Sequence, residues 1–163
     1  MMMKFKIFLI TLISFLSAHI IAQTPAAAVP QFSFLTSDKT EFTNKDLADG
    51  TKLFFVFFDT ECEHCQHVIA YMDAHYGQFS KAAIYLVTLD AENKTAPFFA
   101  KYGSRLTGKH TVMVLLDYKS EFIKKFTPRK YPSLFIYSAQ KKLLLYGDDE
   151  KQLPEFVKVI NKS

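Results

Sequence analysis

The sequence contains no tryptophan, only two cysteines, no internal repeat and no low-complexity stretch. Stability must therefore come from a hydrophobic core, and 163 residues with 17 phenylalanines and eight tyrosines can bury one without crosslinks. Neither sign of charge is in large excess, because the formal net charge is +4 and falls to +2 without Lys4 and Lys6. So mild a balance gives no reason to expect nucleic acid or an anionic membrane as a partner.

The first 22 residues have the pattern of an export signal. A short basic segment ending at Lys6 precedes an apolar run, Ile7–Leu16, and small residues follow where a signal peptidase could cut, after Ala22. The run is shorter than the ~20 apolar residues of a membrane span, and no cysteine lies near the cut to accept a lipid. We predict a signal peptide over residues 1–22 and a periplasmic or otherwise exported protein. Retention of residues 5–21 as a membrane anchor is the alternative.

The rest of the chain has the pattern of one α/β domain over residues 31–163, preceded by a linker of small residues over 23–30. Nearly continuous apolar runs predict buried strands, and apolar residues at helical spacing predict helices. Strands that alternate with helices and end in a hairpin and a helix predict an α/β sandwich around a central sheet. The predicted elements are a strand over 31–38, a helical turn over 43–50, a strand over 52–59, a helix from Cys62 to a stop at Gly77, a strand over 82–90, a helix over 95–103 with Pro97 in its first turn, a strand over 110–117, a helix over 118–126, strands over 132–138 and 141–147, and a helix over 150–160.

The two cysteines, Cys62 and Cys65, follow the predicted central strand directly and open a predicted helix. A disulfide between them would close a loop of only a few residues and would stabilise the fold little, which argues against a structural role. At a helix start both sulfurs face the same side, within bonding reach. Cys62 is the predicted nucleophile, because free backbone N–H groups and the helix dipole stabilise a thiolate there. Cys65, one turn further in and more covered, would resolve the mixed disulfide.

Two segments resemble the TlpA/ResA-like thioredoxins, a family of exported thiol–disulfide oxidoreductases. They are "FSFLTSDKTEFTNKDLADGTKLFFVFFDTECEHC" and "RKYPSLFIYSAQKKLLLYG". The resemblance implies a thioredoxin-like three-layer sandwich with a central mixed β-sheet flanked by helices. It implies that Cys62 and Cys65 are the redox pair and that Pro132 is in cis beside them, where Tyr131 and Pro132 contact substrate. It also implies disulfide exchange with exported protein thiols, in the reductive direction, fed by a membrane thiol-transfer protein and without a bound cofactor.

The residues around the cysteines depart from that family. Glu61 stands where the family often has tryptophan, and Val56 stands where thioredoxin has a buried acid. Proton transfer would then come from Glu61, Glu63 or water. His64 precedes the second cysteine, as in disulfide-forming relatives, and an imidazole there would stabilise the Cys62 thiolate and make the disulfide more oxidising. The charges of Glu61 and Glu63 would oppose that effect.

A copper-binding or copper-delivery module is one alternative, because Cys62, His64, Cys65 and His67 are all able to ligate zinc or copper. On a single helix these four side chains would not converge on one ion. We therefore assign no metal site from the sequence and interpret His67 as a solvated surface residue.

A peroxidase on the same fold is a second alternative. Peroxiredoxins resemble this architecture but have a threonine three residues before the reactive cysteine. That position holds Asp59 here, and Thr60 comes one place too late, so its hydroxyl would point elsewhere. An interaction module without turnover is a third alternative, against which the presence of both cysteines argues.

Overall fold

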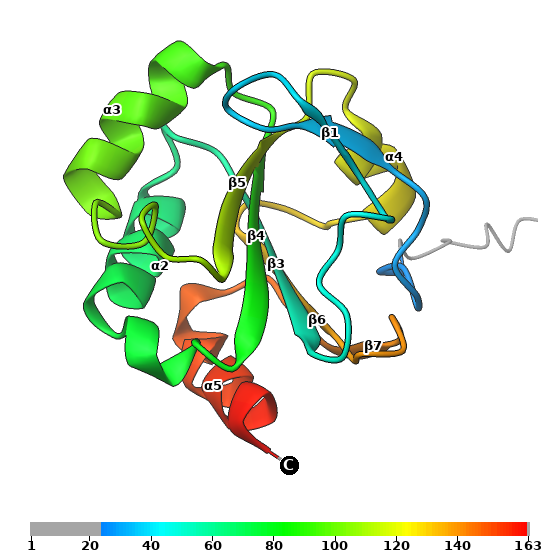
Figure 1. Ribbon diagram of the computed structural model, residues 1–163. Coiled ribbons are helices and arrows are strands. Elements are labelled where there is room, and N and C mark those ends of the chain that lie inside the picture. Colours follow the sequence, from blue (N-terminus) through cyan, green and yellow to red (C-terminus); the bar gives the residue numbers. More distant parts are fainter. Residues whose placement is uncertain (1–23, 163) are drawn as a thin grey trace, which may run out of the picture.

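A central sheet of seven strands organises the protein (Figure 1). The computed structural model describes residues 24–162, so the predicted signal peptide over 1–22 lies outside the described residues. Within the described part, no helix is long and apolar enough to cross a membrane. The strands are β1 (Ser33–Leu35), β2 (Glu41–Thr43), β3 (Lys52–Phe58), β4 (Ala82–Thr88), β5 (Val112–Leu116), β6 (Ser133–Tyr137) and β7 (Leu143–Gly147). Their order is β2-β1-β5-β4-β3-β6-β7.

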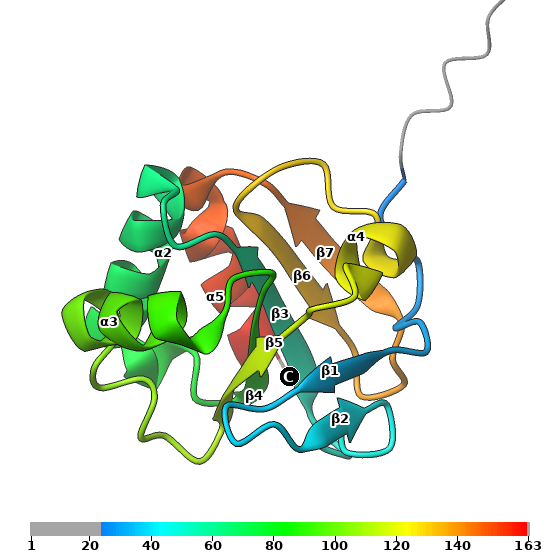
Figure 2. The ribbon, with the colours of Figure 1, turned by 90° about the horizontal axis from the view of Figure 1, so that it is seen from above.

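The sheet is mixed and lies between two layers of helices (Figures 1 and 2). β3 pairs in parallel with β4, and β4 with β5, whereas the other pairs are antiparallel. The helices α2 (Glu63–Ala74), α3 (Glu92–Tyr102) and α5 (Leu153–Asn161) cover one face, and α4 (Glu121–Phe126) covers the other (Figure 2). The predicted three-layer sandwich is therefore confirmed. The short 3-10 helices are η1 (Tyr76–Gln78) and η2 (Glu150–Gln152).

β3 is an inner strand, between β4 and β6, and leads directly to the cysteines. Its residues alternate between the two faces, and both faces are buried, which explains the continuous apolar run. Val56 packs in the core beneath α2, α3 and α5, together with Cys65. Phe57 packs in the opposite core, where its ring stacks on Phe122 at 4.6 Å between centroids. Stacked phenylalanines fill this second core, so the fold needs no tryptophan.

The segment predicted as a helical turn over 43–50 is instead the end of β2 followed by irregular turns. That prediction was wrong because local side-chain hydrogen bonds replace helical ones. The carboxylate of Asp46 accepts hydrogen bonds from the backbone N–H and the hydroxyl of Thr43, at 2.8 and 2.9 Å. Asn44 is buried and accepts the Phe32 N–H at 2.8 Å. Such side-chain bonds compete with helix formation.

Helix boundaries also differ from the prediction: α4 begins at Glu121 rather than at 118, and residues 150–152 form η2, so that α5 begins at Leu153. α3 begins at Glu92, so Pro97 lies inside the helix rather than in its first turn. The earlier start follows from the carbonyl of Ala91, which accepts the N–H groups of both Lys94 and Thr95. α2 ends at Ala74, before the predicted stop at Gly77, which lies within η1.

Gly103 ends α3 as predicted and allows α3 to approach α2 closely. Its N–H donates to the carbonyl of Phe99 at 2.9 Å. A Cβ at this position would lie only 2.9 Å from Ile69 Cγ2 and from Phe99 Cδ1. Glycine at this position therefore fixes how closely α3 packs against the helix that carries the cysteines.

The chain before β1 lies along the edge strand β7. The N–H of Val29 donates to the carbonyl of Lys141, and the N–H of Leu143 donates to the carbonyl of Ala27, both at 2.9 Å. The hydroxyl of Tyr137 donates to the carbonyl of Ala26 at 3.1 Å. The described part of the segment predicted as a linker is thus hydrogen-bonded to the domain.

Candidate active site

Cys62 and Cys65 lie where β3 ends and α2 begins. Cys62 is the N-cap of α2, and its sulfur accepts the backbone N–H of Cys65 at 3.3 Å. The cap position normally uses a side-chain oxygen for this purpose, so the thiol here receives a donor that stabilises negative charge. The two sulfurs are 2.7 Å apart and both cysteines are free. The Cys-x-x-Cys spacing therefore brings the two sulfurs within bonding reach, as the sequence predicts.

The two cysteines differ in exposure. Cys62 is partly exposed, whereas Cys65 is 0% exposed and packs in the core with Val56. Burial raises the pKa of the Cys65 thiol well above its ordinary value, and the hydrogen bond with Cys62 raises it further. A backbone hydrogen bond from Asp59 acts in the opposite direction. Cys65 is therefore a protonated thiol at neutral pH, shielded from solvent.

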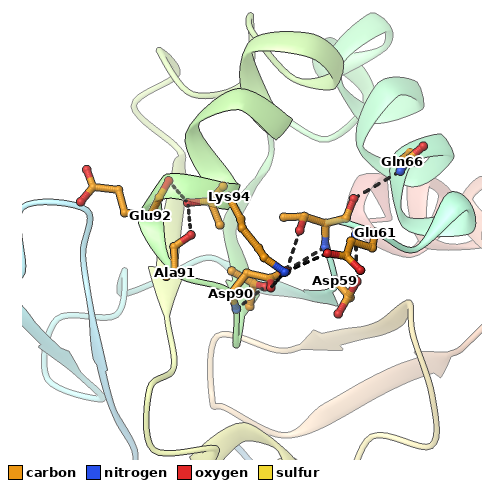
Figure 3. A network of polar contacts seen from close by, with 10 residues as sticks. Asp59, Glu61, Gln66, Asp90, Ala91, Glu92 and Lys94 are labelled. Carbon is orange, nitrogen blue, oxygen red and sulfur yellow. Dashed lines mark hydrogen bonds and ion pairs between the residues drawn. The ribbon is translucent and has the colours of Figure 1, made fainter.

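The loop between β3 and Cys62 is held by the loop after β4. One carboxylate oxygen of Asp90 accepts both the backbone N–H and the hydroxyl of Thr60, at 2.9 and 2.8 Å. The side chain of Gln66 donates to the carbonyl of Thr60 at 3.2 Å, which ties the same residue to α2 (Figure 3). The N–H of Cys62 donates to the carbonyl of Asp59 at 3.3 Å. These bonds fix the position of Cys62 at the start of the helix.

Lys94 brings a positive charge to the residue before Cys62. Its ammonium lies 2.8 Å from a carboxylate oxygen of Glu61 and 3.8 Å from one of Asp90 (Figure 3). The hydrogen bond to Glu61 is the main cause of the raised pKa of Lys94. Glu61 is 78% exposed, so solvent screens the pair. Lys94 thus partly balances the charge of Glu61, which is expected from the sequence to oppose the stabilisation of the Cys62 thiolate by His64. The sequence pattern did not indicate Lys94 as a partner.

The two histidines of α2 meet a carboxylate from η2. The Nδ1 atoms of His64 and His67 lie 3.4 and 3.0 Å from the same oxygen of Glu150. Both histidines are exposed, and Glu63 is exposed in the first turn of α2. The sequence interpretation of His67 as a surface residue missed this partner. Glu150 is 83 residues further along the chain, so no local signal could have shown it.

The loop before β6 forms the other side of the site. The Tyr131–Pro132 peptide bond is cis, as predicted. The ring of Tyr131 lies 4.7 Å from that of Phe57. Burial, followed by the negative charges of Asp59 and Asp90, raises the pKa of Tyr131 to about 12. Beside this loop is a surface pocket of about 320 Å³, lined by His64, Lys130, Tyr131, Pro132, Asp148, Asp149, Glu150 and Lys151.

A dithiol at the start of a helix, directly after the central strand of a mixed sheet, defines a thioredoxin-like protein. The AhpC/TSA family matches residues 25–145, and the chain belongs to that family. No curated protein sequence matches the chain.

Solved structures with the same fold include three at low sequence identity. The thioredoxin domain of a thiol–disulfide oxidoreductase from Bacteroides vulgatus is 14% identical, with a TM-score of 0.68 over 86% of this chain and 100% of that one. A thiol–disulfide oxidoreductase from Bacteroides fragilis is 15% identical, with a TM-score of 0.64 over 81% of this chain and 98% of that one. The peroxidoxin BcpB from Mycobacterium tuberculosis is 14% identical, with a TM-score of 0.68 over 87% and 100%. The predicted resemblance and thioredoxin fold are confirmed, and the family supports an oxidoreductase.

Proposed function

We propose that the protein exchanges disulfides with exported protein substrates through Cys62 and Cys65, in the reductive direction. One observation carries the proposal: the two sulfurs are 2.7 Å apart, with one partly exposed at a helix start and the other fully buried. That asymmetry supplies an accessible attacking thiol and a protected resolving thiol within reach of the same sulfur.

The reaction balances with the residues present. The Cys62 thiolate attacks one sulfur of a substrate disulfide, the substrate S–S bond breaks, and the first substrate thiolate leaves and takes up a proton. Cys65 then loses its proton and attacks the Cys62 sulfur of the mixed disulfide, which releases the second substrate thiol. The substrate has gained two electrons and two protons, and the protein holds a Cys62–Cys65 disulfide. A thiol-transfer protein in the membrane is the proposed donor that restores the dithiol.

The second step needs an acceptor for the Cys65 proton. The buried acid of thioredoxin cannot be that acceptor here, because Val56 occupies its position. The negative charge of Asp59 acts on both Cys65 and Tyr131, raising the pKa of each. The carboxylate of Glu61, by contrast, faces Lys94 at 2.8 Å. We therefore propose Asp59, which follows β3 directly, as the acceptor in place of Glu61.

Substrate would bind across the pocket beside the cis-proline loop. Tyr131 and Pro132 line it together with His64, the residue between the two cysteines. An extended peptide would pair with the backbone of this loop, which is the strand-addition mode of peptide recognition. Export, and with it a periplasmic location and exported substrates, rests on the sequence pattern of residues 1–22.

The test is turnover of insulin disulfides by the purified full chain, with dithiothreitol as the electron source. The wild-type protein should accelerate insulin reduction, and Cys62→Ser and Cys65→Ser should each abolish the acceleration while retaining the far-UV circular dichroism of the wild type. His75→Ala, on the same helix, serves as the matched control and should retain turnover. Equal insulin reduction by the wild type and Cys62→Ser would refute the proposal.

A peroxidase is a second candidate, which the similarity to the peroxidoxin BcpB favours. The geometry around the cysteine argues against it, because the hydroxyl of Thr60 donates to Asp90 at 2.8 Å and is not available to a peroxide at Cys62. Consumption of hydrogen peroxide with dithiothreitol as reductant separates the two functions. Turnover of peroxide in the absence of any insulin reduction would establish the peroxidase instead.

A further inference from the structure

Three side chains on the surface, two from α2 and one from η2, bring metal-ligating atoms close together. The Nδ1 atoms of His64 and His67 lie 3.4 and 3.0 Å from one carboxylate oxygen of Glu150. All three candidate ligand atoms lie within 4.8 Å of one another. The centroids of the imidazole rings are 6.4 Å apart, and the ring planes are nearly perpendicular, at 83°.

We propose that His64, His67 and Glu150 form a binding site for a divalent transition-metal ion, with zinc as its representative. Imidazole nitrogen and carboxylate oxygen are preferred zinc ligands at about 2.0–2.2 Å. Ligand atoms at such distances are about 3.3 Å apart in a tetrahedral shell. The two separations to Glu150, 3.4 and 3.0 Å, are close to that value, and all three ligand atoms lie within 4.8 Å of one another.

The backbone holds the ligands in place before any ion binds. His64 and His67 are three residues apart on α2 and therefore share one face of that helix. Glu150 begins η2, whose start is fixed by a capping box in which Asp149 accepts the Lys151 N–H at 2.9 Å. Gln152 accepts the Asp149 N–H at 3.2 Å in return. A site drawn from two anchored elements loses little conformational entropy on binding.

Exposure suits ion entry and a fourth, exchangeable ligand. The side chains of His64 and His67 are 68% and 58% exposed, whereas that of Glu150 is 23% exposed. Three protein ligands with one position open to water is the usual arrangement of an accessible zinc site. Cys65 is 0% exposed in the core and takes no part. The proposed site uses neither cysteine, but it shares His64 and Glu150 with the pocket beside the cis-proline loop.

Calorimetric titration with zinc chloride tests the site directly. Every protein in the series is the untagged full chain carrying Cys62→Ser and Cys65→Ser, so that no thiolate competes for the ion. The parent protein should bind one zinc ion per chain. Adding His64→Ala, His67→Ala or Glu150→Gln should each weaken binding by about tenfold or more, since even outer-shell changes cost that much.

His75→Ala is the matched control, because His75 ends the same helix and its Nδ1 contacts the Tyr71 carbonyl at 2.9 Å. It should leave zinc binding unchanged, and circular dichroism should show that every variant remains folded. Absence of saturable binding to the parent would overturn the proposal. So would unchanged affinity in Glu150→Gln, or equal weakening by His75→Ala. Failure of insulin reduction by the wild type would leave these results unaffected.

Discussion

The buried thiol of Cys65 should make the reduced protein less stable at alkaline pH. Cys65 is 0% exposed, and burial raises its pKa above that of the same thiol in the unfolded chain. Its contribution to stability is therefore fully present below the unfolded pKa of about 8.5 and is lost as the pH rises towards the folded value. In this range the unfolded chain releases a proton that the native protein retains.

The magnitude follows from proton linkage. One proton released only on unfolding lowers the free energy of unfolding by about 1.4 kcal/mol per pH unit. Between neutral pH and pH 10, Cys65 alone should account for about 2 kcal/mol. That is a large part of the ~5–15 kcal/mol that stabilises a typical domain.

Urea denaturation of the reduced protein with a chelator present, at pH 7.5 and pH 10, measures this loss. Cys65→Ala is the reference, because it keeps Cys62 and the three tyrosines whose pKa values are raised, Tyr85, Tyr131 and Tyr137. The wild type should lose about 2 kcal/mol more than Cys65→Ala over this interval. Parallel pH dependence in the two proteins would refute the conclusion that Cys65 stays protonated in the core.

Three further changes test the site and its supports. His64→Pro should make the dithiol pair more reducing by about 30 mV, measured against dithiothreitol buffers with a chelator present; an unchanged potential would exclude tuning by this histidine. Asp90→Ala should lower the free energy of unfolding in urea by about 1.5–3 kcal/mol, because Thr60 loses the acceptor of two hydrogen bonds; a cost below about 0.5 kcal/mol would contradict that role. Gly103→Ala should cost about 1–3 kcal/mol through overpacking between α2 and α3. Gly108→Ala, with open space around its Cβ position, is its control, and equal costs would refute the packing argument.

Those parts of the fold that follow from local patterns could be predicted from the sequence. β3 and β4 are covered on both faces, so their sequences are almost continuously apolar. α2 was predictable because Cys65, Ile69 and Met72 recur at helical spacing, and all three are buried. The position of the cysteines at a strand end and helix start follows from these two elements.

The supports of the site could not be predicted, because they join residues that only the completed sheet brings together. Asp90 and Thr60 are 30 residues apart, and Lys94 and Glu61 are 33 apart. Parallel pairing of β3 with β4 places the loops after both strands at the same edge of the sheet. No periodicity in the sequence carries that information. The misassigned turn after β2 has a different cause, since short polar side chains there bond the backbone locally.

The central claim is that Cys62 attacks and Cys65 resolves, and trapping of mixed disulfides tests it most directly. Each single serine variant, in its reduced form, is mixed with insulin, quenched with acid and separated by non-reducing electrophoresis. The account predicts a covalent adduct between Cys65→Ser and insulin, because the Cys62 mixed disulfide forms but is not resolved. It predicts no adduct with Cys62→Ser, whose remaining thiol is buried and protonated. An adduct with Cys62→Ser and none with Cys65→Ser would contradict the account.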